Sequence, residues 1–308
     1  MRNKVFKTVI FGFLMMTCCA MTNYIYAAES VKINKTNFPD DNLRTIISAY
    51  DKNDDGVFSD DEIDDIKFLE IRINNLAPDI CNYDTDKKSE TAKWAKYMVL
   101  DCKGLEHFTS LKELIIGVPP ISWGVEVEVD GKLVKTELRN IKYLYKLNNL
   151  KKLTIFGEHK ARTSYDVSKF EKLEYLNLTS TNIKQLDVSK NKNLKVIEIN
   201  GNERLKKVDL SKNSKLKEIQ VSYCSLKKII FSKDNKIKTI DLRDNKLQKL
   251  NLSRVNKKTL KTLRVNVNPL KKINISDFKN LKWLKVGSKT KVVQKEKQNV
   301  KINVQDIY

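Results

Sequence analysis

Histidine, cysteine, glycine and proline are all scarce in this chain of 308 residues, which contains 2 His, 5 Cys, 9 Gly and 5 Pro. The two histidines, His107 and His159, belong to no H-E-x-x-H metal motif, and no G-x-S-x-G elbow, phosphate loop or local Cys–His signature is present. Because these patterns carry much of known hydrolytic and phosphoryl-transfer chemistry, we predict that the protein is not an enzyme. Two facing carboxylates would suffice for glycan hydrolysis and leave no sequence signature, so a hydrolase stays open as the least favoured alternative.

Long apolar runs are equally rare, and the longest lies near the N-terminus. The apolar stretch Thr8–Met21 follows three basic residues and precedes the small residue Ala27. This stretch is too short to span a bilayer comfortably, so we predict that 1–27 is a secretory signal peptide. Lipid attachment at Cys18 or Cys19 stays open, although the residues before them lack the character of a lipidation motif.

Removal of 1–27 would leave three cysteines, which are too few for a dense disulfide framework. Cys81 and Cys102 flank an insertion and could form a bridge in an oxidising compartment, and the sequence leaves this open. Cys224 occupies a position at which the surrounding repeats carry asparagine or threonine. We therefore predict that Cys224 is a buried, unreactive thiol.

Acidic residues are outnumbered, with 38 Asp and Glu against 59 Lys and Arg and a net charge of +21. Without 1–27 the balance is 56 basic to 38 acidic residues, a net charge of +18. Such a charge attracts anionic wall or host polymers. No nucleic-acid-reading motif accompanies it, so we predict no specific nucleic-acid partner. Solvated turn lysines such as Lys206 and Lys207 would give the same charge without any function.

One spacing dominates the rest of the chain, because L-x-x-L-x-L-x-x-N-x-L returns every 21 to 23 residues. Its copies begin at Ile66, Leu173, Leu194, Leu216, Ile237 and Leu260, and the pattern fades from Leu281. One unit buries little apolar surface alone, but stacked units share a continuous core. We therefore predict an α/β solenoid, a curved leucine-rich-repeat fold with a parallel sheet on its concave side from Ile66 to Val286.

The repeat assigns a role to each position. Alternating apolar residues should point inward from the strands, and these are Leu176, Leu178, Ile197, Ile199, Ile219, Val221, Ile240, Leu242, Leu263 and Val265. At the ninth position an asparagine amide can satisfy backbone groups where the chain turns out of the sheet. Asn74, Asn202, Asn245 and Asn268 fit this role, with Thr181 and Cys224 as substitutes. The second half of each repeat also recurs, as in Asp187-Val188-Ser189-Lys190-Asn191 and its near copies.

Two insertions interrupt the early repeats, near 77–94 and 118–138. The first is polar and is predicted to be a surface loop. The second contains an alternating segment broken by Asp130-Gly131, which predicts a β-hairpin. The chain therefore divides into the signal peptide 1–27, a helix-loop-helix cap 28–65, leucine-rich repeats 66–288 and a C-terminal cap or tail 289–308.

A calcium-loop pattern lies directly before the first repeat. Residues 51–62 match D-x-[DN]-x-[DN]-G-x5-E without a departure, between two segments of helical character. The predicted ligands are oxygens of Asp51, Asn53, Asp55, Val57, Ser59 and Glu62. Gly56 should permit the sharp turn, and Phe58 should face inward. The sequence leaves open whether calcium would be structural or regulatory, and a lone extracellular loop favours a structural clip.

These features together resemble a known family. Lys32-Ile33-Asn34, the segment from Phe38 to Arg44, the calcium loop and the L-D-V-S-K-N repeats are similar to secreted, internalin-like leucine-rich-repeat proteins of Gram-positive bacteria. The resemblance spans about Val31 to Lys285 and implies binding to a protein or glycan at a cell surface. Many such proteins carry a wall-sorting signal. The residues up to Tyr308 show no LPxTG, which favours release, or retention at the surface by charge.

The outward positions of the strands are the predicted partner-binding surface. Exposed aromatic residues bury much area at low entropic cost, and charged neighbours add specificity. The candidates are Phe156, Tyr175, Asn177, Glu198, Tyr223, Asp241, Arg264 and Trp283. Two alternatives remain, namely that some of these aromatics only pack on neighbouring strands, and that the protein binds anionic polymers through its overall charge.

Overall fold

The computed structural model describes residues 30–72, 99–117, 127–129, 132–134, 136–158, 162, 164–296 and 298–306. The predictions about the signal peptide 1–27, the loop 77–94, Asn74, Cys81 and His159 therefore lie outside the described residues. Within these ranges no helix is long and apolar enough to cross a membrane.

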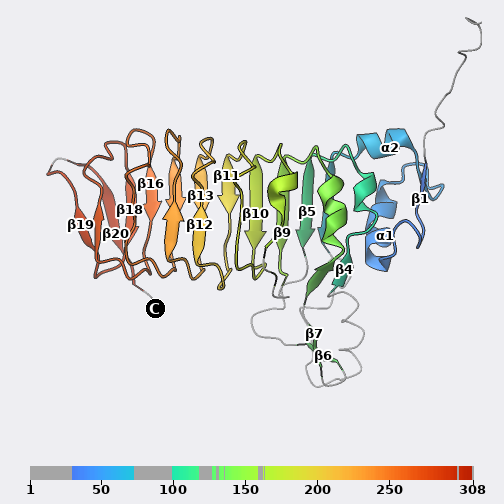
Figure 1. Cartoon of the computed structure of the whole chain (residues 1–308), viewed down its shortest axis with the longest axis horizontal. Coiled ribbons are helices and arrows are strands. Elements are labelled where there is room, and N and C mark those ends of the chain that lie inside the picture. Colours follow the sequence, from blue (N-terminus) through green and yellow to red (C-terminus); the bar gives the residue numbers. More distant parts are fainter. Residues whose placement is uncertain are drawn as a thin grey trace, which may run out of the picture.

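A parallel sheet of ten strands runs along the molecule, and its strands follow one another in chain order (Figure 1). They are β3 (Phe68–Arg72), β5 (Glu113–Gly117), β9 (Lys152–Phe156), β10 (Tyr175–Thr179), β11 (Val196–Glu198), β13 (Glu218–Gln220), β15 (Thr239–Asp241), β16 (Thr262–Arg264), β18 (Trp283–Val286) and β20 (Lys301–Val304). Each strand belongs to the first half of one repeat, and the ten strands run parallel to one another. The predicted α/β leucine-rich-repeat solenoid is confirmed.

The sheet is stacked without any shift in register, so equivalent repeat positions form continuous columns. Leu176 pairs with Ile197, Ile197 with Ile219, and Ile219 with Ile240. All ten residues predicted to face inward are 0% exposed and belong to one apolar cluster that runs from Val31 to Val286. This cluster includes the N-terminal cap, so the predicted boundary at 65–66 separates two structural motifs but not two cores.

The second half of each repeat returns the chain and adds short elements to the same core. These are three two-stranded parallel sheets, β4 (Val99–Asp101) with β8 (Glu137–Arg139), β12 (Lys207–Asp209) with β14 (Lys228–Ile230), and β17 (Lys272–Asn274) with β19 (Lys291–Val293), and the 3-10 helices η4 (Leu105–His107), η5 (Ile141–Lys146) and η6 (Val167–Lys169). Lys207 begins β12 and Lys228 begins β14, so the lysines interpreted as turn residues start strands.

Buried asparagines hold the turns in two ladders. In the first, which the sequence predicted, Asn202 donates to the carbonyl of Leu178 (2.8 Å) and accepts from Ile183 N–H (3.1 Å). The sequence suggested no role for the second. It contains Asn191, whose amide donates to Val167 O (2.8 Å) and Phe170 O (2.9 Å), and Asn213, which repeats the pattern one turn later. Where these asparagines occur, they tie a repeat to the preceding one, on both sides of the core.

The N-terminal cap has the predicted helix-loop-helix form. Helix α1 (Asp41–Ile47), extended by η1 (Ser48–Tyr50), and helix α2 (Asp60–Asp65) flank the loop. The loop strand β2 (Val57–Phe58) pairs antiparallel with β1 (Val31–Lys32). Phe58 is fully buried as predicted and lies 5.4 Å from the ring of Phe108, which joins the cap to the first repeats. The φ of 104° at Gly104, and the 2.1 Å that would separate a Cβ there from Phe38, both require glycine.

The sheet departs from its predicted boundary at the C-terminal end, whereas the second insertion agrees with the prediction. The sheet continues past its expected end at Val286, because β20 pairs in parallel with β18 and brings Ile302 beside Leu284. Residues 289–306 thus complete a further repeat, which the fading leucine pattern concealed. The hairpin predicted in the second insertion is confirmed, since β6 (Val127–Val129) pairs antiparallel with β7 (Lys132–Val134). It lies beyond the ends of the sheet strands (Figure 1).

Candidate binding surface and acidic loop

The outward strand residues form two columns along the sheet, and we call them together the sheet face. The third-position column is Phe68, Glu113, Lys152, Tyr175, Val196, Glu218, Thr239, Thr262, Trp283 and Lys301. The fifth-position column is Glu70, Ile115, Thr154, Asn177, Glu198, Gln220, Asp241, Arg264, Lys285 and Asn303. Strand pairing places the predicted residues of each column in register, and the change from acidic to basic between Glu198 and Lys285 follows one column.

Three of the predicted partner-binding residues meet at the middle of the sheet face. The Tyr175 hydroxyl and the Asn177 amide both donate to Glu198 Oε2 at 2.9 Å. Thr179 donates to Asn177 Oδ1 at 2.6 Å and fixes the amide from the other side. Burial, and then the Glu198 carboxylate, raise the pKa of the Tyr175 hydroxyl above its usual value. The cluster is half-buried and rigid, and it presents one carboxylate with defined neighbours.

Asp241 departs from the prediction that it is available to a partner, because it is only 1% exposed. Its Oδ2 pairs with Arg243 at 3.0 Å and with Arg264 at 3.2 Å. The Arg243 guanidinium also lies 5.8 Å from the ring of Tyr223, which follows β13 and is 52% exposed. Asp241 therefore positions two arginines and, through Arg243, an exposed tyrosine. The surface offered here is cationic and aromatic.

Large apolar side chains are exposed at both ends of the third-position column. Trp283 is 50% exposed, as predicted, and the Lys301 ammonium lies 4.5 Å from its ring centroid. Phe68, on β3 at the other end, is 44% exposed. Phe68 is not among the predicted partner-binding residues, although it holds the third position of the copy that begins at Ile66. Its third position within the repeat is the feature of the sequence that would have predicted its exposure.

Phe156 is half-buried at the end of β9, where it lies against the neighbouring strand. A Cβ on Gly117 would stand 2.3 Å from Cζ of the Phe156 ring, so this ring position requires glycine. The Arg72 guanidinium covers the ring at 5.8 Å. Much of the Phe156 side chain therefore packs on the neighbouring strand, as one of the two alternatives proposed, and only its remaining surface faces outward.

The acidic loop 51–62 is held in a turn by hydrogen bonds from its own backbone. Asp51 accepts from Asp54 N–H (3.0 Å) and Gly56 N–H (2.8 Å), and Asp55 accepts from Val57 N–H (2.8 Å). Gly56 has a φ of 77°, which meets the expectation that this position requires glycine. The predicted side-chain ligands are therefore ordered by the turn and lie on one loop.

Glu62, the predicted closing ligand, is 6% exposed and has a second role. Its Oε1 accepts from Lys52 N–H and its Oε2 from Ser59 N–H, both at 2.9 Å, while Ser59 Oγ donates to Oε2 at 2.8 Å. This capping box starts α2, and the Ser59 and Lys52 hydrogen bonds lower the pKa of Glu62.

The oxygen donors of the loop are chemically suited to calcium. Carboxylate, amide, hydroxyl and carbonyl oxygens on one loop are what a hard cation of this size prefers. Within the described residues, however, no three carboxylate, histidine or cysteine side chains converge on one point. For the Glu62 carboxylate to bind a calcium ion through both oxygens, the side chain would therefore have to leave its hydrogen bonds in the capping box.

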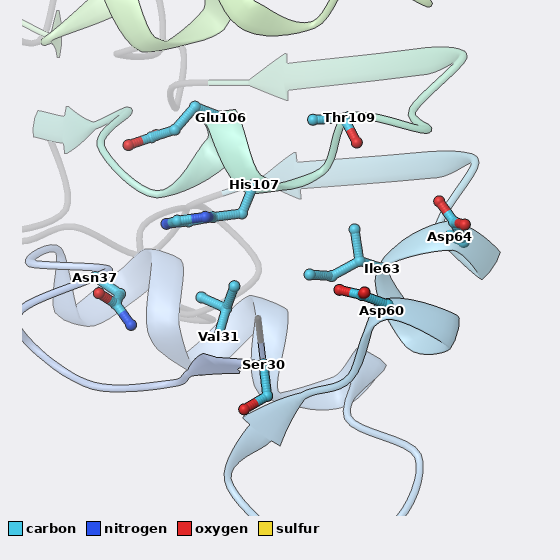
Figure 2. Close-up of a pocket in the computed structure, with 9 residues that line it drawn as sticks. All are labelled: Ser30, Val31, Asn37, Asp60, Ile63, Asp64, Glu106, His107 and Thr109. Atoms are coloured by element: carbon cyan, nitrogen blue, oxygen red, sulfur yellow. The ribbon is translucent and has the colours of Figure 1, made fainter. Parts of the chain in front are cut away.

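A shallow pocket lies between the cap and η4 and contains His107 (Figure 2). Its walls also include Asp60 and Asp64 of α2 and Glu106. Figure 2 shows that these three carboxyl groups lie apart around the pocket. Two of them are engaged, since Asp64 accepts from Ser110 Oγ and Glu106 accepts from Gly104 N–H, both at 2.6 Å. The pocket therefore brings no acid and base into a catalytic arrangement.

The two cysteines that the structure describes, Cys102 and Cys224, are both buried and free. Cys224 continues the first asparagine ladder, with Sγ 3.2 Å from Ile199 O and 3.4 Å from Asn202 N. Burial raises the pKa of the Cys224 thiol to about 11. It raises the pKa of the Cys102 thiol as well. Both therefore remain protonated at neutral pH, and the prediction of a buried thiol at Cys224 is confirmed.

Solved structures of leucine-rich-repeat proteins share this architecture, whereas no family model and no curated protein matches the chain. Internalin C2 of Listeria monocytogenes is 15% identical, with a TM-score of 0.54 over 87% of this chain and 98% of the internalin. The functional domain of InlJ from the same species is 17% identical over 89% of this chain, with a TM-score of 0.49, and this chain spans 63% of that domain's length. At such identities the similarity to internalin C2 shows the fold alone, a leucine-rich-repeat solenoid.

Proposed function

We propose that this protein is a secreted, non-enzymatic binding scaffold that recognises a protein or glycan partner at a cell surface through the sheet face. The observation that carries the proposal is the exposure of Trp283, 50%, and Phe68, 44%, on a rigid parallel sheet. Exposed aromatics beside ordered polar groups are typical anchors of interfaces. The Tyr175, Asn177 and Glu198 cluster lies between these two anchors and supplies directional hydrogen bonding.

Replacing Tyr175, in this cluster, and Trp283, one of the anchors, with alanine is expected to weaken partner binding by about 2 kcal/mol for each residue. The partner would first be captured from host-surface and bacterial-wall extracts by the wild-type protein, and its affinity for each variant would then be measured. The matched control reverses the charge at four exposed lysines that lie away from the sheet face, Lys206, Lys207, Lys227 and Lys228. The loss of affinity caused by the aromatic changes should exceed the loss caused by the lysine changes, and this difference should widen at high salt, where screening weakens charge attraction. Binding that survives the aromatic changes but is abolished by the lysine reversals would contradict the proposal.

Calcium binding by the acidic loop forms a second part of the proposal. Asp51, Asn53 and Asp55 are already ordered by the turn, and Val57 O, Ser59 and Glu62 would complete an oxygen shell. In the other orientation Glu62 caps α2, so the ion and the capping box compete for one carboxylate. Since β2 and Phe58 join the loop to the core, a bound ion would stabilise the cap as a structural clip.

Millimolar calcium is expected to raise the stability of the cap by roughly 1–2 kcal/mol, if the affinity is that of extracellular calcium modules. Glu62→Gln should remove most of this gain, because an amide cannot coordinate as a bidentate anion. Asp61→Asn is the control, since it removes the same charge from an exposed neighbour. Thermal melting with calcium and with chelator measures the effect, and identical curves for the wild type would count against the clip.

A further inference from the structure

A row of lysines follows the edge of the ten-stranded sheet at which the strands begin. It occupies the second position of the repeat, and we call the following residues the lysine row: Lys67, Lys112, Lys151, Lys195, Lys217, Lys238, Lys261 and Lys282. Glu174 holds this position between Lys151 and Lys195, and Val300 holds it before β20. Each backbone N–H in the row donates to the carbonyl of the preceding member at 2.7–2.8 Å, from Lys112 to Lys282 without interruption.

These hydrogen bonds determine the spacing of the charges. Neighbouring strands lie about 4.8 Å apart, so the nine positions from Lys67 to Lys282 span roughly 38 Å. Lys195 pairs with Glu174 at 2.5 Å, and this contact lowers the pKa of the Glu174 carboxyl. The other seven lysines are exposed, and in the part of the chain that the structure describes none of them forms a salt bridge, although Lys151 lies close enough to Glu174, and Lys67 to Asp65, to lower the pKa of that carboxyl. Like charges at strand spacing repel, and an anion along the row would relieve this repulsion.

Overall composition does not account for the row. Lys and Arg make up 59 of the 308 residues, fewer than one in five, whereas lysine holds the second position before eight of the ten sheet strands. The sheet face beside it is mixed, with Glu113, Glu218 and Thr239 among its third-position residues. The concentration of positive charge therefore belongs to one repeat position, and the fold turns that position into a continuous row.

We propose that the lysine row binds a linear, flexible polyanion, a sulfated or phosphorylated polymer that lies along the solenoid. Lysine ammonium groups are flexible point charges that suit repeated anions without fixed geometry, whereas arginine would favour planar, bidentate partners. Single-stranded nucleic acid fits less well, because its bases need regularly spaced aromatic platforms. Among the described third-position residues, which flank the row, the aromatic ones are Phe68, Tyr175 and Trp283, and they stand several strands apart. This site is separate from the sheet face and does not depend on the partner proposed for that face.

The test compares two variants of equal net charge with probes of defined length. The row variant carries Lys217→Gln, Lys238→Gln and Lys261→Gln, and the control carries Lys207→Gln, Lys228→Gln and Lys272→Gln at exposed positions of β12, β14 and β17. Heparin oligosaccharides and inorganic polyphosphates serve as probes, so the two arms distinguish sulfated sugars from phosphate chains. In full-length protein near physiological salt, the row variant should bind the preferred probe at least about tenfold more weakly, and the control should lose about twofold or less.

Two further measurements make the test specific to the row. The slope of log K against log salt should fall by about two in the row variant, or about 0.7 for each lost contact. Changing the same three lysines to arginine should retain binding within about twofold, which separates loss of charge from loss of folding. Equal losses in the row and control variants would overturn the proposal in favour of bulk charge. Tighter binding of single-stranded DNA than of either probe at equal charge would overturn it in favour of nucleic acid.

Discussion

Asn245→Ala is expected to destabilise the protein by about 3–5 kcal/mol, because each buried polar group that loses its partner costs about 1–3 kcal/mol. The Asn245 amide donates to Val221 O at 2.7 Å and Leu242 O at 3.1 Å, and its Oδ1 accepts from Leu226 N–H at 3.0 Å. Asn245 is 3% exposed, so water cannot replace these contacts without opening the turn. Chemical denaturation followed by circular dichroism measures the loss.

The repeats themselves provide the controls for Asn245. Cys224 holds the equivalent position one repeat earlier and still contacts the carbonyls of Ile199 and Ser222, so Asn245→Cys should cost clearly less than alanine. Asn251→Ala should cost under about 1 kcal/mol, since Asn251 is exposed and accepts only from Ser253 N–H. If Asn245→Ala and Asn251→Ala lower the stability equally, the asparagine ladder does not contribute to the stability of the fold.

Glu158→Ala is expected to cost about 3–5 kcal/mol, because it leaves a buried ion pair and its hydrogen bonds without their anion. The Glu158 side chain is 0% exposed and accepts from Arg162 at 2.7 Å, from Leu138 N–H at 3.1 Å and from the Tyr165 hydroxyl. Arg162 also donates to Leu138 O at 2.8 Å. This network ties β8, at the base of the second insertion, to the residues after β9. Thermal and denaturant unfolding would report the loss.

A surface ion pair is the matched control for the Glu158 network. Lys52 and Asp65 lie 2.5 Å apart, but their side chains are 63% and 64% exposed, so Asp65→Ala should cost far less stability than Glu158→Ala. Changing Glu158, Arg162 and Tyr165 together to apolar residues of similar size should recover much of the stability, because no buried charge then lacks a partner. Equal costs for Glu158→Ala and Asp65→Ala would contradict the assignment of a buried, stabilising network.

The alkaline limit of stability should also depend on this network. Burial, and then the charge of Glu158, raise the pKa of Tyr165 well above the usual value of 10.0. Because the pKa is raised in the folded state, the hydroxyl network is fully stabilising below about pH 10, and its contribution is lost as the pH rises above that value. Tyr165→Phe should therefore lessen the alkaline loss of stability, which pH-dependent melting would detect.

The repeat spacing was enough to predict the architecture, because a solenoid is built from local units. Each repeat buries its leucines against the adjacent repeats only, so the order of the strands and the inward residues follow from periodicity. The ladder role of Asn202 and Asn245 followed in the same way from one position of the repeat. The last repeat was missed because Lys301–Val304 lacks the leucine spacing, and only its pairing with β18 shows that it continues the sheet.

The properties of individual surface residues needed contacts between repeats, which no single repeat contains. Asp241 has the outward position that the sequence assigned to it, but Arg264 from the next repeat pairs with its carboxylate and helps to bury it. Phe156 likewise lies over Gly117, which is 39 positions away in the chain. Glu62 fits a ligand pattern in the sequence, whereas the folded loop also engages it in a capping box.

The sequence by itself therefore determined the repeat, the inward columns, the loop pattern and the set of outward residues. The tertiary structure decided which of those residues are exposed, and it aligned the lysine row along one sheet edge, because backbone hydrogen bonds stack equivalent positions at a constant spacing. In the sequence these lysines are separated by 21 to 45 residues and look like ordinary solvated charges. The exposure of a side chain and the alignment of charges both depend on contacts between neighbouring repeats. The physical reason is that side chains in a sheet pack against those of the adjacent strands.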